Sequence, residues 1–247
     1  MSLLEASLVM AAGLAAGAIN TVVGSGSLIT FPTLLWVGLP PVVANVSNTV
    51  GLVPGAVSGA WGYRRELSGQ RARLVRLSTA TLSGSVVGAT LLLVLPPGVF
   101  AAVVPALILL ACILVTIQPW LVRRLADRPR REHGGPLVWV FVFAAGMYGG
   151  YFGAAQGVLL IAILALGLDE TLQRVNAAKN VLAGLANLIA GIVFVIVADV
   201  NWAAAGLVAV GAAIGGLLGA RLARSLPPIG LRAVVVAIGI VAVVTLL

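Results

Sequence analysis

The stretch Gly24-Ser25-Gly26-Ser27 interrupts an apolar segment that covers residues 8–37. Glycine costs a helix about 1 kcal/mol relative to alanine, and the four residues bring backbone amides and hydroxyls to membrane depth, so they predict a broken membrane helix. Irregular backbone at that depth persists only where it is buried in protein or lines a wet cavity. The break has two interpretations, a packing kink and part of a substrate site, and discontinuous helices build such sites in many transporters.

The composition around this stretch is that of an integral membrane protein. Of the 247 residues, 61% are hydrophobic and 9% are charged, and the mean hydropathy is +1.14. Soluble domains carry about a quarter charged residues. A helix needs roughly 20 apolar residues to span a bilayer, which leaves room for about eight spans. We therefore expect an all-α, multi-pass protein of the cell inner (plasma) membrane, with the lipid bilayer as its surroundings.

Charge and the rare residue types exclude several classes of function. The net charge of +8 comes from arginines in short loops between apolar segments, which the positive-inside rule explains without nucleic acid. Cys112 and His133 are the only residues of their types, so we expect no disulfide within the chain, no metal site and no cofactor. An enzyme would need a nucleophile with its base, or paired carboxylates, inside the membrane. Neither set accompanies the breaks, so we expect no enzyme.

The apolar segments fall into two halves with the same order. Each half has a first segment, a break and a segment too short to span, and three full spans follow. The segments of the first half are 4–23, 28–37, 42–63, 77–95 and 99–122, and those of the second are 137–152, 158–166, about 171–198, 202–220 and 229–247. The domain bounds follow as 1–122 for the first transmembrane repeat, 123–136 for a cytoplasmic linker and 137–247 for the second repeat.

Shared glycines and prolines support the repeat. Three glycines of the first half recur in the second at one constant spacing: Gly17, Gly24 and Gly38 match Gly146, Gly153 and Gly167. The leucine-proline-proline turn at 95–97 matches the one at 226–228. One match would be noise in so apolar a chain, but several in the same order predict an internal repeat.

The arginine loops set the expected topology. If the loops at 64–76, 123–132 and 221–224 lie inside, the turns at 38–41, 96–98 and 199–201 lie outside. Each broken segment is then a hairpin that enters and returns on one side, followed by three spans. An odd number of spans per half makes the repeat inverted in topology. Inverted repeats are the architecture of alternating-access transporters, with the site at the repeat interface.

Polar residues cluster after each break. Asn45, Ser47 and Asn48 follow the first, and Asn176 and Asn180 follow the second together with Lys179, the only lysine. An intramembrane cation marks a functional site by default, although a lysine near a helix end also snorkels to the surface. Carboxylates are nearly absent from the spans, whereas cation pathways usually carry them. Amides, hydroxyls and a cation around a helix start therefore indicate an anion.

The motifs of the first half resemble the sulfite exporter TauE/SafE family. They are the run from Gly17 through Asn20 to Ser27, Pro32, the turn at 38–41 and the run 44–48. Residues 146–157 and 175–180 look like the companion repeat, although the second break is poorer in glycine, with Ala154, Ala155 and Gln156. The resemblance covers about residues 8–245. It implies a membrane permease for sulfite, organosulfonates or related sulfur-containing anions.

We therefore expect a secondary transporter for a small sulfur-containing anion, working by alternating access at the repeat interface. The alternatives are an anion channel and a membrane-embedded enzyme, and a homodimer is left open. The candidate substrate-binding residues are Asn20, Gly24, Ser25, Gly26, Ser27, Asn45, Ser47, Asn48, Gln156, Asn176, Lys179 and Asn180.

Overall fold

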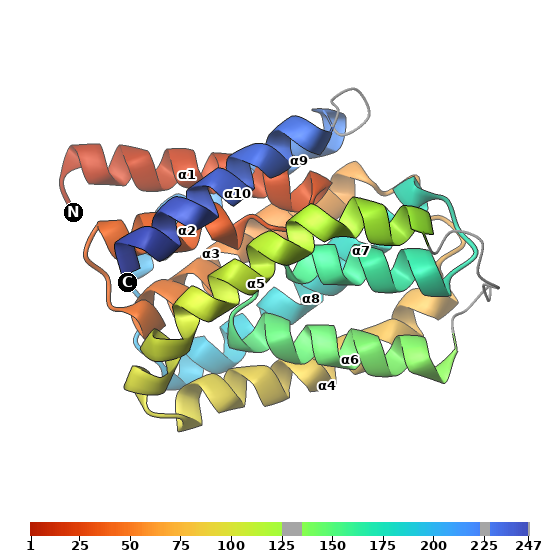
Figure 1. Cartoon of the computed structure of the whole chain (residues 1–247), viewed down its shortest axis with the longest axis horizontal. Coiled ribbons are helices and arrows are strands. Elements are labelled where there is room, and N and C mark those ends of the chain that lie inside the picture. The colour runs from red at the N-terminus through yellow and green to blue at the C-terminus, as the bar shows by residue number, and fades with distance from the viewer. Residues whose placement is uncertain (125–134, 223–227, 247) are drawn as a thin grey trace.

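A computed structural model describes residues 1–124, 135–222 and 228–246, and these ranges fold into ten helices (Figure 1). The helices are α1 (Leu3–Val22), α2 (Ser27–Trp36), α3 (Pro41–Gly62), α4 (Arg71–Val94), α5 (Pro97–Arg124), α6 (Pro136–Tyr151), α7 (Gln156–Gly167), α8 (Leu172–Val197), α9 (Trp202–Leu222) and α10 (Pro228–Leu246). The all-α prediction is confirmed. Most of the predicted linker at 123–136, and the arginine loop after α9, lie outside the described residues.

Five of the described helices are long and apolar enough to cross a membrane: α1, α4, α5, α8 and α9. α3 has 22 residues but is not among them, because Asn45, Ser47, Asn48 and Thr49 lie together in its first half and lower its hydropathy. The short segments α2 and α7 follow the two breaks as predicted, with 10 and 12 residues. A ten-residue helix is about 15 Å long, half the thickness of the hydrocarbon core.

The predicted loop at 64–76 is shorter than expected. α4 begins at Arg71, so Arg71, Arg73 and Arg76 belong to its first turns rather than to a connection. Arginine is a good helix former, and a helix continues beyond the apolar core when its side chains reach the polar interface. The apolar segment in the sequence corresponds only to the membrane part of this helix. The helix begins at Arg71, six residues before the predicted start of the span at residue 77.

The two broken hairpins open toward opposite ends of the molecule (Figure 1). α1 and α2 enter and return at the end that also holds the last turns of α10, whereas α6 and α7 do so at the other end. We call this other end the arginine end, because α3 and α9 finish there next to Arg64 and Arg221 and α4 begins there with Arg71.

Helix packing repeats between the halves with the partners exchanged. α1 packs against α9, and its counterpart α6 packs against α4. α3 packs against α9 and α8 against α4, while α2 contacts α10 and α7 contacts α5. The counterparts α3 and α8 contact each other, as do α5 and α10. This exchange is the pattern that two structurally equivalent repeats produce, and it makes the interface between the halves the centre of the fold.

Small residues allow close backbone contact along two helix pairs, α1–α9 and α4–α6, which we call the glycine seams. A Cβ added at Gly215 of α9 would lie 2.0 Å from the backbone oxygen of Leu14 in α1. On the equivalent seam, a Cβ at Gly88 of α4 would lie 1.9 Å from the backbone oxygen of Met147 in α6. Without a hydrophobic driving force between helices in lipid, such close backbone packing drives their association.

The seam supplies a first prediction. Gly215→Ala should lower the free energy of unfolding by about 1–3 kcal/mol, because the added methyl forces α9 away from α1. Gly206→Ala on the same helix is the matched control, since a Cβ there meets no atom within 4 Å. Thermal unfolding of both purified variants measures the difference, and equal stability of the two would contradict the packing role of the seam.

Candidate functional site

The two breaks meet in the structure. The backbone N–H of Gly157 donates a hydrogen bond of 3.1 Å to the carbonyl oxygen of Gly24. Both breaks turn through glycines with positive φ, +91° at Gly24 and +78° at Gly153. The expectation that the stretches 24–27 and 153–157 come together is therefore confirmed. We call the region formed by residues 23–27 and 152–157 the crossing.

Backbone contact explains two of the glycines in the first break. A Cβ at Gly24 would lie 2.5 Å from backbone atoms of Gly157, and its positive φ also disfavours other residues. A Cβ at Gly26 would lie 2.4 Å from the carbonyl oxygen of Ala16 in α1. Packing alone thus requires glycine at both positions. A bulky substitution at Gly26 would report on the α1–α2 contact rather than on room for a ligand.

Lys179 of α8 holds the end of α1. Its ammonium donates to the carbonyl oxygens of Asn20 at 2.7 Å and Thr21 at 3.1 Å, and to the side-chain oxygen of Asn180 at 3.0 Å. The side chain is 0% exposed, so the snorkelling interpretation is wrong. An ammonium has three protons, and all three are used in this arrangement. Lys179 therefore caps the last carbonyls of a broken helix, where a cation also opposes the negative end of the helix dipole.

Asparagines on α8 and α3 cap the breaks reciprocally. The side-chain amide of Asn176 on α8 donates to the Thr21 oxygen of α1 at 3.1 Å. The side-chain amide of Asn45 on α3 donates to the Tyr151 oxygen of α6 at 3.0 Å. The long polar helix of each half thus satisfies the open end of the broken helix of the other half. This reciprocity ties the two hairpins to each other at the crossing.

The remaining candidates divide into two groups. Asn48 donates from its side-chain amide to the Ser27 hydroxyl at 3.1 Å and accepts from the Thr30 hydroxyl, which joins α3 to the start of α2. Ser47 points elsewhere, since its hydroxyl accepts the backbone N–H of Asn201 at 2.9 Å, at the start of α9. Of the candidate set, the structure therefore does not bring the Ser47 side chain to the crossing.

Among the described residues, four buried polar atoms around the crossing have no hydrogen-bond partner. They are the hydroxyl of Ser25, the side-chain oxygens of Asn45 and Asn176 and the side-chain nitrogen of Gln156. Ser25 and Asn45 are each 1% exposed, Gln156 is 3% exposed and Asn176 is 7% exposed. A buried polar group without a partner costs about 1–3 kcal/mol, and native structures keep few of them. Two of these atoms belong to the breaks themselves, and a polar ligand bound at the crossing would supply the hydrogen bonds that they lack.

Two tyrosines take part that sequence reasoning did not place at the site. The buried hydroxyl of Tyr63 accepts from the Asn176 amide at 2.9 Å. The hydroxyl of Tyr148 donates to the Ala154 oxygen at 2.6 Å, inside the second break. Tyr148 lies next to a break in the sequence, and this position is a weak indication of a role at the site. Tyr63 lies at the far end of a predicted span beside arginines, where no sequence pattern indicates such a role.

A carboxylate links the helices at the arginine end. Glu170, in the connection before α8, accepts from Arg174 at 2.6 Å and from Arg73 of α4 at 3.0 Å. The hydrogen bond from Arg174 is the main cause that lowers the pKa of the Glu170 carboxyl, and the bond and charge of Arg73 act in the same direction. Gln70 adds a bond of 3.0 Å from its side chain to the Arg174 backbone oxygen.

The fold and the crossing define a multi-pass membrane protein with two broken helices that meet at the interface of its halves. The model of the sulfite exporter TauE/SafE family matches residues 9–246, so the chain belongs to this family. The resemblance read from the motifs is thereby confirmed.

Curated relatives carry related names. "Probable membrane transporter protein YfcA" of Escherichia coli (strain K12) is 27% identical over 214 residues, which cover 85% of this chain and 77% of that protein. A "Probable membrane transporter protein" of Haemophilus influenzae is 25% identical, with 85% and 82% covered. "Probable membrane transporter protein ORF9" of Sinorhizobium sp is also 25% identical, with 85% and 80% covered. No solved structure matches the chain.

The cap on α1 supplies a second prediction. Lys179→Met should lower the free energy of unfolding by about 2 kcal/mol, because the Asn20 oxygen loses its hydrogen bond from a charged donor. Asn187→Leu, a buried change two turns further along α8, is the control and should have a smaller effect. Unchanged stability of Lys179→Met together with lost transport would instead assign the ammonium to the substrate.

The Glu170 network supplies a third prediction, on pH. Because the pKa of Glu170 is lower in the folded protein than in the unfolded chain, its ionised form stabilises the fold at neutral pH. This contribution is complete above the unfolded pKa and is lost as the pH falls through the folded pKa. Glu170→Gln should therefore be less stable than the wild type at pH 7, and the gap should close in acid. A gap that stays constant between pH 7 and pH 3 would contradict this origin.

Proposed function

We propose that the protein is a secondary transporter of the cell inner membrane that moves a small sulfur-containing anion, such as sulfite or an organosulfonate, by alternating access at the crossing. The observation that carries the proposal is the set of unpartnered buried atoms of Ser25, Asn45 and Gln156 beside two broken helices. Broken helices in transporters present free backbone groups to a substrate near the membrane centre.

The start of α2 is a favourable place for an anion because the positive end of the helix dipole lies there. The backbone amides of Leu28 and Ile29 donate to the carbonyl oxygens of Ser25 at 3.2 Å and Gly26 at 2.9 Å, so the dipole and the Ser25 hydroxyl, rather than these amides, are what the helix start offers. The hydroxyl of Ser25 stands directly before this start and has no partner among the described residues. A sulfur oxyanion has several acceptor oxygens of the kind that helix starts bind.

The distribution of charge favours an anion over a cation. The described acidic residues all lie in connections or in a first helical turn: Glu5, Glu66, Asp169, Glu170 and Asp199. The Lys179 ammonium, in contrast, lies within the membrane part, and its side chain reaches Gly157, whose Cβ would lie 3.0 Å from Lys179 Cδ. Its protons are used, so it acts on the substrate through the field around the crossing rather than through a direct bond.

The arrangement of the halves supports alternating access over a fixed pore. The hairpins open toward opposite ends, and the helices exchange partners between the halves. Ser25 and Gln156 are buried in this conformation, so a substrate reaches them only when one half moves against the other. Rocking of one repeat against the other around a fixed site is the expected motion of an inverted repeat.

The relatives' names favour transport over membrane-bound catalysis, because each is called a membrane transporter. A channel remains the second candidate. Counterflow in proteoliposomes separates the two, since only a carrier exchanges labelled sulfite for unlabelled sulfite held inside. Exchange of sulfite or methanesulfonate, with no exchange of acetate, is the expected result. Absence of exchange for every sulfur oxyanion tested would overturn the proposed substrate class.

The unpartnered hydroxyl supplies a fourth prediction. Ser25→Ala should weaken substrate affinity about fivefold, the equivalent of about 1 kcal/mol for one neutral hydrogen bond, and should leave stability unchanged or higher because no internal bond is lost. Ser85→Ala is the matched control, since its hydroxyl donates to the Gly146 oxygen at 3.1 Å within the α4–α6 seam. It should lower stability and keep affinity.

Affinity and thermal stability measured on the same purified samples decide between the interpretations of the break. If Ser25→Ala keeps full affinity for every anion that the wild type binds, the break is a packing kink and the crossing is not the site.

A further inference from the structure

A polar pocket of about 400 Å³ opens at the arginine end between the ends of α3 and α9. Three arginines line it: Arg64 and Arg65, just after α3, and Arg221, in the last turn of α9. Among the described residues, no carboxylate lines this pocket, and none of the three arginines has an ion pair. Arg64 stacks on Trp61, with its guanidinium carbon 5.2 Å from the ring centre, so an aromatic ring holds one wall of the pocket.

The polar pocket continues into an apolar groove. This groove, also about 400 Å³, runs between α3 and α8 and shares Trp61 and Arg64 with the polar pocket. Val57 and Leu188 form part of its walls, and both are exposed apolar side chains. Asn180, which also bonds Lys179 and the end of α1, lies in its lining.

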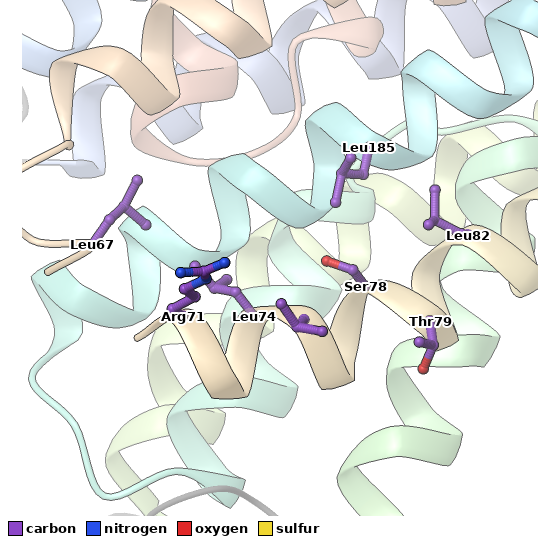
Figure 2. A pocket seen from close by; sticks show the side chains of 8 residues that line it. Leu67, Arg71, Leu74, Ser78, Thr79, Leu82 and Leu185 are labelled. Atoms are coloured by element: carbon purple, nitrogen blue, oxygen red, sulfur yellow. The ribbon is translucent and has the colours of Figure 1, made fainter. Parts of the chain in front are cut away.

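A second apolar groove lies beside the first. It measures about 550 Å³ and shares Leu67 and Leu185 with the groove between α3 and α8. Figure 2 shows it along α4, with Arg71 toward one end of the row, Leu82 at the other and Leu185 across from them. The three spaces thus form one connected surface, charged at the arginine end and apolar along the helices.

We propose that this surface binds one anionic phospholipid, with its phosphate among Arg64, Arg65 and Arg221 and its two acyl chains in the two grooves. Basic pockets between transmembrane helices bind acidic lipid headgroups, and the three arginines lie at the end of the helices where a headgroup plane is expected. The grooves have the apolar walls that acyl chains need. The groove between α3 and α8 begins beside the polar pocket, and the groove along α4 adjoins that first groove at Leu67 and Leu185.

Charge argues against the other occupants. A free anion would use the polar pocket but would leave both apolar grooves without a partner. A second copy of the chain, paired through the same face, would bring Arg64 and Arg71 of each copy toward the same arginines of the other, and like charges in contact are unfavourable. An anionic lipid alone matches both the charge and the apolar walls.

Native mass spectrometry of the purified full-length protein tests the proposal with phosphatidylglycerol and phosphatidylcholine of identical chains. The wild type should retain one phosphatidylglycerol in clear preference to phosphatidylcholine. Each arginine near an anionic lipid contributes about a fivefold gain in binding, so Arg64→Gln should lower retention about fivefold and the triple change of Arg64, Arg65 and Arg221 to Gln about a hundredfold. Equal retention of the two lipids by the wild type would overturn the proposal.

Arg124→Gln is the matched control for charge. Arg124 also ends a helix and also stacks on a tryptophan, Trp120, at 5.2 Å, but it lines none of the three spaces. It should retain phosphatidylglycerol like the wild type. A loss equal to that of Arg64→Gln would show a general surface charge effect and would also overturn the specific pocket.

A groove-filling change separates the lipid from its alternatives. Val57→Trp should lower phosphatidylglycerol retention at least fivefold by filling the groove between α3 and α8, whereas Val86→Trp, on the exposed part of α4 outside the three linings, should not. Full retention in Val57→Trp, together with displacement of the lipid by inorganic phosphate, would show a free-anion site. A doubled mass without bound lipid, lost in Val57→Trp, would show a second copy of the chain on this face.

Discussion

The carbonyl oxygens at the end of a helix broken inside a membrane need donors, and this constraint organises the structure. Lipid offers none, so each open end must be satisfied from within the protein. The Thr21 oxygen at the end of α1 accepts from Lys179, Asn176 and Asn180. Supplying these donors makes the first half of α8 polar, and the same demand at the end of α6 makes α3 polar. Both helices must then lie at the centre, wrapped by the apolar helices that form the glycine seams.

The sequence predicted those features that depend on local composition. Apolar length predicted the helices, and the two glycine-containing runs predicted the two breaks, which meet in the structure. It failed where a side chain's direction or a distant partner decides. Ser47 and Asn48 are neighbours in sequence, yet adjacent residues of a helix point about 100° apart, so Asn48 meets α2 while Ser47 meets the start of α9.

Lys179 shows the same limit on a larger scale. Its position along α8 was compatible with a snorkelling anchor and with a substrate ligand, and in this conformation its ammonium donates to Asn20, Thr21 and Asn180. Its acceptors Asn20 and Thr21 lie about 160 positions away in the chain, so no local pattern could pair them. Only the packing of the two halves brings the ammonium to the end of α1. Tyr63 is a similar case, because the residue that bonds its hydroxyl, Asn176, lies 113 positions away in the chain.

The groups that cap the ends of α1 and α6 differ in charge, and this difference makes the two sides of the crossing electrostatically unequal. Asn45, which donates to the end of α6, is neutral, whereas the end of α1 is capped by a cation. A helix end carries roughly half a negative charge and the following helix start roughly half a positive one. At the first break the positive charge of Lys179 exceeds the partial negative charge at the end of α1, so the partial positive charge at the start of α2 is not cancelled at the crossing. At the second break no described cation offsets the partial negative charge at the end of α6. The positive potential is therefore concentrated beside Ser25, on the side where the unpartnered hydroxyl stands.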